Sequence, residues 1–182
     1  MKKVLLLVSV FVFFGCGSEQ SRTVLPGSFK YLSYNWNNSK DSVGLSLLYY
    51  LDIAKDGNYS LIVRNKPDST GYYYGFIGNA TLEFLNHFAT DTTSYNNYYL
   101  VADTASKALR YKFDYADSTA SKKITFATTG APQELYKVQE KLDPIVNAPN
   151  KKKSQVFNID LYLRKLIAED SGALSRKPVL KK

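Results

Sequence analysis

Histidine and cysteine, which often serve as catalytic base and nucleophile, occur once each in this chain. His87 is the only histidine and Cys16 the only cysteine among 182 residues. A single imidazole excludes a metal site that needs two histidines. A single thiol excludes an intrachain disulfide and a cysteine metal cluster.

The remaining titratable residues do not form a recognisable catalytic motif. His87 lies in an apolar segment, 81–89, with no nucleophile next to it in the sequence, so we interpret it as a strand residue and not as a catalytic base. The sequence contains no glycine-rich phosphate loop, calcium loop or Gly-x-Ser-x-Gly elbow. We therefore expect no enzyme activity, no cofactor and no metal site. Two carboxylates that face each other could act as a glycosidase pair, but the spacing of the acids in the sequence gives no evidence that any two of them do. The acids considered are Asp52, Asp56, Glu83 and Asp114.

Cys16 ends an N-terminal segment with the pattern of an export signal. Lys2 and Lys3 give a positive start, residues 4–14 are an apolar run, and Gly15 precedes the cysteine. The run is too short to span a bilayer as a stable anchor. This segment resembles a bacterial lipoprotein signal, with Phe13 where Leu is usual.

The resemblance implies a location for the protein. Residues 1–15 would be removed, and Cys16 would carry diacylglycerol on its thiol and a further acyl chain on its amine. Gly17 and Ser18 follow Cys16 at the second and third mature positions, where Asp would resemble an inner-membrane retention signal, so the outer membrane is favoured. We expect a cell-envelope lipoprotein that faces the periplasm or the cell surface and is held to the membrane by this anchor.

The positive charge is concentrated at the C-terminal end. The net charge is +8, yet residues 17–147 hold 13 basic and 13 acidic side chains, while residues 148–182 hold nine basic and three acidic ones. Such a tail would be drawn to anionic lipid or lipopolysaccharide head groups, and we expect no nucleic-acid partner. The alternative is that these lysines only solvate a helix and its end.

The body of the chain has the pattern of an antiparallel meander. Short alternating runs are separated by turn residues, as in the run from Leu109 to Tyr115, where apolar residues alternate with Arg110, Lys112 and Asp114. This alternation predicts a half-buried strand with a polar outer face. The predicted strands are 28–36, 43–53, 58–64, 72–77, 81–88, 97–102, 108–115, 122–128 and 134–139. Tight turns are predicted at Lys55 to Asn58 and at Gly78-Asn79.

A sheet with one apolar face must close on itself or be covered, and closure is the simpler solution. The chain resembles the lipocalin-like lipoproteins common in Bacteroidetes at Leu25 to Phe29, at Asp56 to Tyr59 and at Gly75 to Phe84. The residue pattern predicts an all-β meander of about 8–10 strands followed by one C-terminal amphipathic helix capped by Ser154. The resemblance implies that the meander is closed or nearly closed into a lipocalin-like barrel with this helix packed beside it. The expected organisation is a signal peptide (1–15), a lipidated cysteine and tether (16–26), a barrel (27–142), a linker (143–153), a helix (154–171) and a basic tail (172–182).

Aromatic residues are the main functional lead, since they make up 14% of the chain. Consecutive rings must point to both faces of their strands, so some line the interior and some point outward. The first hypothesis is a small amphipathic or apolar ligand bound in a lumen; its lining candidates are Tyr111, Phe113, Tyr115, Ile124, Phe126, Tyr136 and Val138. The second is an interaction module with a packed core that contacts a protein, a glycan or the envelope surface through the basic tail and exposed rings; the exposed candidates are Trp36, Tyr73 and Tyr98.

Five Asp-Ser or Asp-Thr pairs followed by Val, Ala or Thr resemble the O-glycosylation signal of Bacteroidetes, whose acceptor is the middle hydroxyl. The competing interpretation is that these residue types gather in turns because their side chains bond to the local backbone. The candidate acceptors are Ser42, Ser69, Thr92, Thr104 and Ser118.

Overall fold

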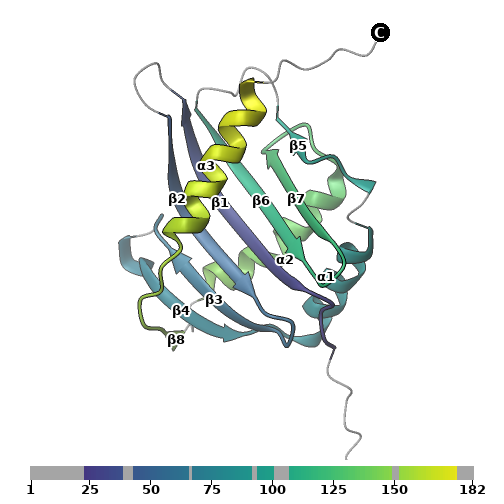
Figure 1. The fold of residues 1–182 in the computed structure, drawn as a ribbon. Helices are drawn as coiled ribbons and strands as arrows, with labels where there is room; N and C mark the ends of the chain where they lie inside the picture. Colours follow the sequence, from purple (N-terminus) through teal and green to yellow (C-terminus); the bar gives the residue numbers. More distant parts are fainter. Residues whose placement is uncertain are drawn as a thin grey trace, which may run out of the picture.

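A computed structural model describes residues 23–38, 43–65, 67–91, 94–100, 107–148 and 152–175 (Figure 1). These residues are rich in β-structure but also form three α-helices, so the all-β prediction holds only roughly. The elements in order are β1 (Ser28–Asn38), β2 (Val43–Ile53), β3 (Asn58–Val63), the 3-10 helix η1 (Pro67–Ser69), β4 (Gly71–Phe76), α1 (Asn79–Asp91), β5 (Tyr98–Tyr99), β6 (Lys107–Ala116), β7 (Ser121–Ala127), α2 (Gln133–Asn147), β8 (Lys152–Lys153) and α3 (Asp160–Ser175).

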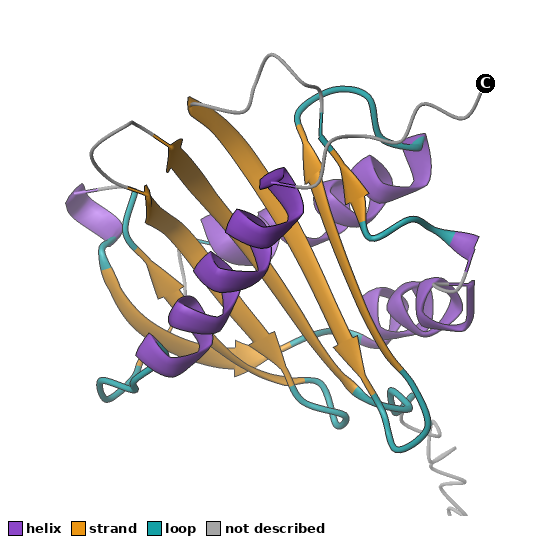
Figure 2. Cartoon of the chain, turned by 45° about the horizontal axis from the view of Figure 1, so that its top comes forward, coloured by secondary structure: helices purple, strands orange, loops and turns teal. Residues whose placement is uncertain are grey.

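The eight strands of the described part of the chain belong to one sheet, in the order β5-β7-β6-β1-β2-β3-β4-β8. Neighbouring strands are antiparallel except β5 and β7, which are parallel. Within the described ranges β5 and β8 are not paired with each other, so the sheet has two edges and the predicted barrel is wrong. The physical reason is that helices cover both faces: α3 crosses one face, and α1 and α2 lie on the other (Figures 1 and 2).

Two of the predicted strands are helices. Residues 81–88 lie in α1 and residues 134–139 lie in α2. The buried residues of α1 are Leu82, Leu85, Phe88 and Ala89, and those of α2 are Leu135, Val138, Leu142 and Val146. Their spacing of mostly three or four residues is helical, and we misread it as strand alternation. The linker predicted from residue 143 is also wrong at its start, because α2 continues through Pro144 to Asn147.

The turn predictions had different outcomes. The hairpin between β2 and β3 is confirmed, since the Gly57 N–H donates to the Ala54 carbonyl over 2.9 Å and Gly57 has a φ of +83°. Gly78 does not form a hairpin. Its carbonyl instead accepts the N–H groups of Thr81 and Leu82 at the start of α1.

Each face of the sheet has its own hydrophobic core. The larger core lies between the sheet and helices α1 and α2, and includes Phe29, Leu51 and Leu61. The smaller core lies under α3 and includes Trp36, Tyr50 and Leu166. Both faces of the central strands are therefore covered, which a purely alternating sequence pattern does not predict.

Helix α3 begins later than predicted. Asn158 Oδ1 accepts the backbone N–H of Asp160 over 2.6 Å, so Asn158, and not Ser154, satisfies a free N–H of the first turn. Residues 152–153 form β8 at the edge beside β4, and Ser154 continues along this edge by donating its backbone N–H to the Tyr72 carbonyl. Part of the predicted helix is thus an extended segment that leads onto the sheet.

Candidate functional site

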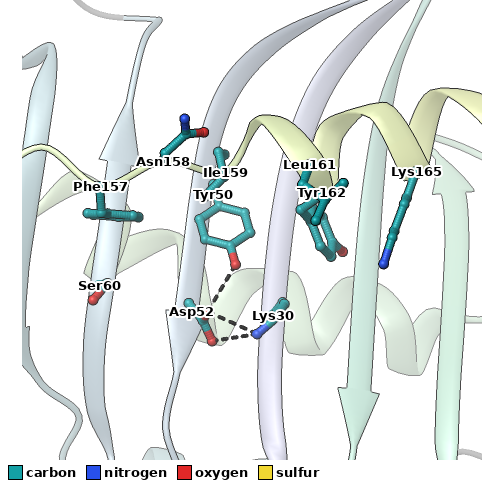
Figure 3. A pocket seen from close by; sticks show the side chains of 10 residues that line it. All are labelled: Lys30, Tyr50, Asp52, Ser60, Phe157, Asn158, Ile159, Leu161, Tyr162 and Lys165. Carbon is teal, nitrogen blue, oxygen red and sulfur yellow. Dashed lines mark hydrogen bonds and ion pairs between the residues drawn. The ribbon is translucent and has the colours of Figure 1, made fainter.

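A groove lies between the first turn of α3 and the sheet, and we call it the α3 groove (Figure 3). Its volume is about 480 Å³. Three neighbouring strands form its floor, and α3 with the segment before it forms its wall. The floor residues are Lys30, Tyr50, Asp52 and Ser60, and the wall residues are Phe157, Asn158, Ile159, Leu161, Tyr162 and Lys165.

The floor is polar and its groups are held in place. Lys30 Nζ lies 2.9 Å from both carboxylate oxygens of Asp52, and the Tyr50 hydroxyl donates to Asp52 Oδ2 over 2.9 Å. Burial, together with the charge of Asp52, raises the pKa of Tyr50 well above its usual range. Tyr50 therefore stays a neutral hydrogen-bond donor, and the floor presents a fixed ion pair beside hydroxyl groups.

The wall is more apolar. Phe157 and Ile159 pack against the core under α3, and Leu161 is 69% exposed at the rim. Tyr162 packs edge to face on Tyr50 with ring centroids 5.6 Å apart, and its hydroxyl donates to Asp114 Oδ2 over 3.0 Å. A groove with an apolar wall and a polar floor matches a ligand that is itself amphipathic.

Beyond the groove, α3 covers a charged face of β6. Arg110 and Lys112 are each 1% exposed and Asp114 is 8% exposed. The prediction that this face is exposed to solvent is therefore wrong, because α3 brings two acids onto it. Lys112 Nζ lies 3.1 Å from Glu169 Oε2, and Arg110 Nη1 lies 3.5 Å from Asp170 Oδ2.

The two acids respond differently to this environment. Burial raises the pKa of Asp170, although Lys112, Tyr34 and Arg110 act to lower it. Burial also opposes ionisation of Glu169, but the hydrogen bonds and charges of Lys123 and Lys112 lower its pKa below the ordinary value. Arg110 also lies 4.7 Å above the ring of Trp36, a cation–π contact. These interactions hold α3 on the sheet at the end away from the groove.

A second polar cluster lies on the opposite face, between the sheet and α2. The Tyr31 and Tyr49 hydroxyl oxygens are 2.6 Å apart, and both donate to Asp143 Oδ1, over 2.8 and 3.1 Å. Burial is the main reason that the pKa of each tyrosine is raised well above 10. Each hydroxyl has one proton and directs it to the α2 carboxylate, so the two tyrosines hold α2 against the sheet through Asp143.

The predicted lumen-lining residues lie on this same face. Phe113 and Phe126 have ring centroids 5.1 Å apart and fill the core, together with Tyr115, Ile124 and Val138, which are also buried. Tyr111 and Tyr136 are half-buried and line a surface hollow of about 280 Å³ beside α2. The structure thus brings the seven candidates together, five of them in close packing.

The other predicted site residues are dispersed. Trp36 and Tyr73 are buried, at 1% and 7% exposure, contrary to the prediction that they are exposed, whereas Tyr98 is 38% exposed. Ser118 is exposed in the turn between β6 and β7, and Ser69 is half-buried in η1. Asp117 Oδ1 accepts the N–H groups of Thr119 and Ala120, as the turn interpretation expects. Glycosylation stays a prediction; Cys16, Ser42, Thr92 and Thr104 lie outside the described residues.

The α3 groove is not predicted by the sequence pattern. The alternating charges of β6 were visible, and so were the adjacent acids Glu169 and Asp170, but nothing in the sequence shows that they face each other. The wall residues Phe157 and Tyr162 come from a segment that begins 97 residues after the floor residue Ser60. Only the fold brings them together.

Comparisons with known proteins identify no family. The chain matches no protein-family model, and a search of curated proteins finds no match. Along the described ranges, no three or more His, Cys, Asp or Glu side chains gather to hold a metal ion. None of the helices in those ranges is long and apolar enough to cross a bilayer.

Proposed function

We propose that this chain is a lipid-anchored, non-enzymatic binding protein of the cell envelope that takes a small amphipathic ligand in the α3 groove. The observation that carries the proposal is the composition of the groove. Lys30, Asp52 and Tyr50 offer charged and hydroxyl groups on one side, and Phe157 and Ile159 offer apolar surface on the other. The lipoprotein-like signal ending at Cys16 supports the envelope location.

The ligand class follows from the size and the chemistry of the groove. A volume of about 480 Å³ lies in the range of small-molecule sites. The Lys30–Asp52 pair is internally compensated, so a polar head with both donors and acceptors fits it better than a bare charge does. The apolar part of the ligand would lie along Phe157, Ile159 and Leu161.

The experiment is native mass spectrometry of the full chain, purified from the membranes of its expression host in mild detergent. A mass excess beyond the anchor lipids that disappears on denaturation would identify a non-covalent ligand. Ser60→Phe places a ring on the groove floor and should reduce ligand occupancy at least about tenfold, since it removes the space for the ligand. Ser46→Phe on β2 is the matched control, because Ser46 is exposed and lies outside the groove.

The outcomes separate the alternatives. Loss of the mass excess in Ser60→Phe but not in Ser46→Phe supports ligand binding in the α3 groove. A bare mass in every sample would refute it and favour the second candidate, an interaction module with a packed core that contacts a protein, a glycan or the envelope surface. The close ring packing of Phe113 and Phe126 is the observation that favours this second candidate.

A further inference from the structure

The surface outside the α3 groove carries the two most exposed large apolar side chains of the described ranges. Val156 is 75% exposed and Leu161 is 69% exposed. Between them, Phe157 packs on Tyr72 with ring centroids 5.4 Å apart, and Ile159 packs on the same core. The segment is therefore anchored inward by alternate residues, and Val156 and Leu161 project outward from a fixed backbone.

Three exposed basic residues lie near these two residues along the chain. Arg164 and Lys165 follow Leu161 by three and four positions on α3, so they share its face of the helix, and Lys152 lies on β8 just before Val156. All three are exposed, and Asp160 is the only acid between residues 152 and 168. The next two acids, Glu169 and Asp170, are paired with cations of the sheet. The outer surface here is thus apolar and positively charged.

We infer that the α3 patch, formed by Lys152, Val156, Leu161, Arg164 and Lys165, docks on the surface of a bilayer that contains anionic phospholipids. Amphipathic surfaces of this kind bind in the plane of a membrane, with apolar side chains between the head groups and cations beside the phosphates. Charge complementarity favours this occupant over a neutral partner.

The inference deepens the proposed function, because it rests on the envelope location and supplies a source for the ligand. Leu161 and Lys165 belong both to the patch and to the wall of the α3 groove. In the docked state the mouth of the groove would therefore lie at the bilayer surface. An amphipathic ligand that partitions into the head-group region could enter the groove without crossing water.

The test uses the full chain, carrying Val156→Cys labelled with a polarity-sensitive fluorophore and reconstituted into vesicles. Neutral phosphatidylcholine vesicles are compared with vesicles that contain 30% phosphatidylglycerol, both with a nitroxide quencher on a fraction of the head groups. We expect quenching in the anionic vesicles only. The same label at Lys137→Cys, on α2 at the opposite face of the sheet, is the positional control and should not be quenched. The unsubstituted chain, treated with the same fluorophore, shows how much of the signal comes from labelling of Cys16.

Charge reversal provides the second arm. Lys152→Glu together with Arg164→Glu, neither of which lines the α3 groove, should weaken docking by at least about 25-fold, taking about fivefold per lost cation. Lys137→Glu with Lys141→Glu is charge-matched on the opposite face and should leave docking unchanged. Equal fluorescence in neutral and anionic vesicles, or equal loss in both double variants, would overturn the inference. Vesicle flotation tests the lipid anchor, and the ligand occupancy of the groove tests the proposed function. A failure of α3 patch docking can therefore be distinguished from a failure of either of these.

Discussion

Arg110 of β6 and Asp170 of α3 face each other inside the protein, with Nη1 and Oδ2 3.5 Å apart and side chains 1% and 0% exposed. Asp170 Oδ2 also accepts a hydrogen bond from the Tyr34 hydroxyl. A charge from the sheet and a charge from the last helix are thus removed from water together. Lys112 Nζ lies 3.9 Å from the other carboxylate oxygen of Asp170, so two cations of β6 face this one acid and help to define where α3 sits.

We first predict that Asp170→Asn destabilises the protein by about 3–5 kcal/mol. The substitution keeps the side-chain volume but leaves Arg110 and Lys112 buried with less compensating charge. Urea unfolding followed by circular dichroism measures the effect. Asp160→Asn, at an exposed position in the first turn of the same helix, should cost at most about 1 kcal/mol, the contribution of an acid at a helix N-terminus. If the double variant Arg110→Met and Asp170→Leu were as unstable as Asp170→Asn, the uncompensated charge would not be the cause.

A second prediction concerns the docking of α3. Trp36 is the only tryptophan, is 1% exposed and belongs to the core under α3. Leu166→Asp places a charge in that core, since Leu166 is 2% exposed, and should release α3 from the sheet. Trp36 emission should then shift to longer wavelength. Leu161→Asp, at a 69% exposed position of α3, should leave the emission unchanged; a shift in both variants would show that Trp36 does not report α3 docking.

A third prediction concerns high pH. Burial raises the pKa of Tyr31, Tyr49, Tyr50 and Tyr162 above that of a free tyrosine. The folded state therefore favours the neutral phenol. The stability that comes from keeping these tyrosines neutral is fully present below about pH 10. As the pH rises further, the free energy of unfolding falls by about 1.4 kcal/mol per pH unit for each such tyrosine.

Absorbance at 295 nm against pH tests the third prediction. Exposed tyrosines should ionise gradually, and the buried ones should ionise in one steep step that coincides with the loss of the far-ultraviolet circular dichroism signal. Above pH 10, the unfolding free energy of Tyr50→Phe should fall less steeply with pH than that of the unsubstituted protein, because one tyrosine fewer contributes to the slope. Gradual ionisation of all tyrosines in a folded protein would contradict the prediction.

The fourth prediction concerns the turn between β2 and β3. Gly57 has a φ of +83°, and a Cβ atom there would lie 2.8 Å from Leu82 Cδ1 and 2.9 Å from Phe76. We expect Gly57→Ala to destabilise the protein by more than about 1 kcal/mol, since it combines a strained backbone with a steric clash. Gly44→Ala is the control, because a Cβ there meets nothing within 4 Å, and it should be neutral or slightly stabilising. Equal thermal midpoints for the two variants would refute the argument.

The sequence pattern predicted six strands well because their alternation of apolar and polar residues reflects the geometry of a strand itself. β1, β2, β3, β4, β6 and β7 lie within two residues of their predicted bounds. The pattern failed for α1 and α2, where apolar residues three or four positions apart also fit a short alternating run. The prediction for 97–102 was confirmed only at Tyr98–Tyr99, and residues 101–106 lie outside the described ranges.

The candidate site could not be predicted in the same way. The floor of the α3 groove comes from residues 30–60 and its wall from residues 157–165. The buried state of Lys112 depends on the position of Glu169, 57 residues later. A charged residue on a strand normally indicates a solvent-facing side, and only a covering helix with opposite charges changes that interpretation.

The amino-acid sequence by itself determined the features that depend on neighbouring residues: the central strands, the Gly57 hairpin and the concentration of positive charge after residue 148. Only the tertiary structure decided that the sheet stays open, that α3 covers its charged face, and that a groove forms where α3 begins. The physical reason is the distance along the chain over which each interaction acts. Strand alternation and turn chemistry act within a few residues, whereas covering a sheet face requires two complementary surfaces from distant parts of the chain to meet.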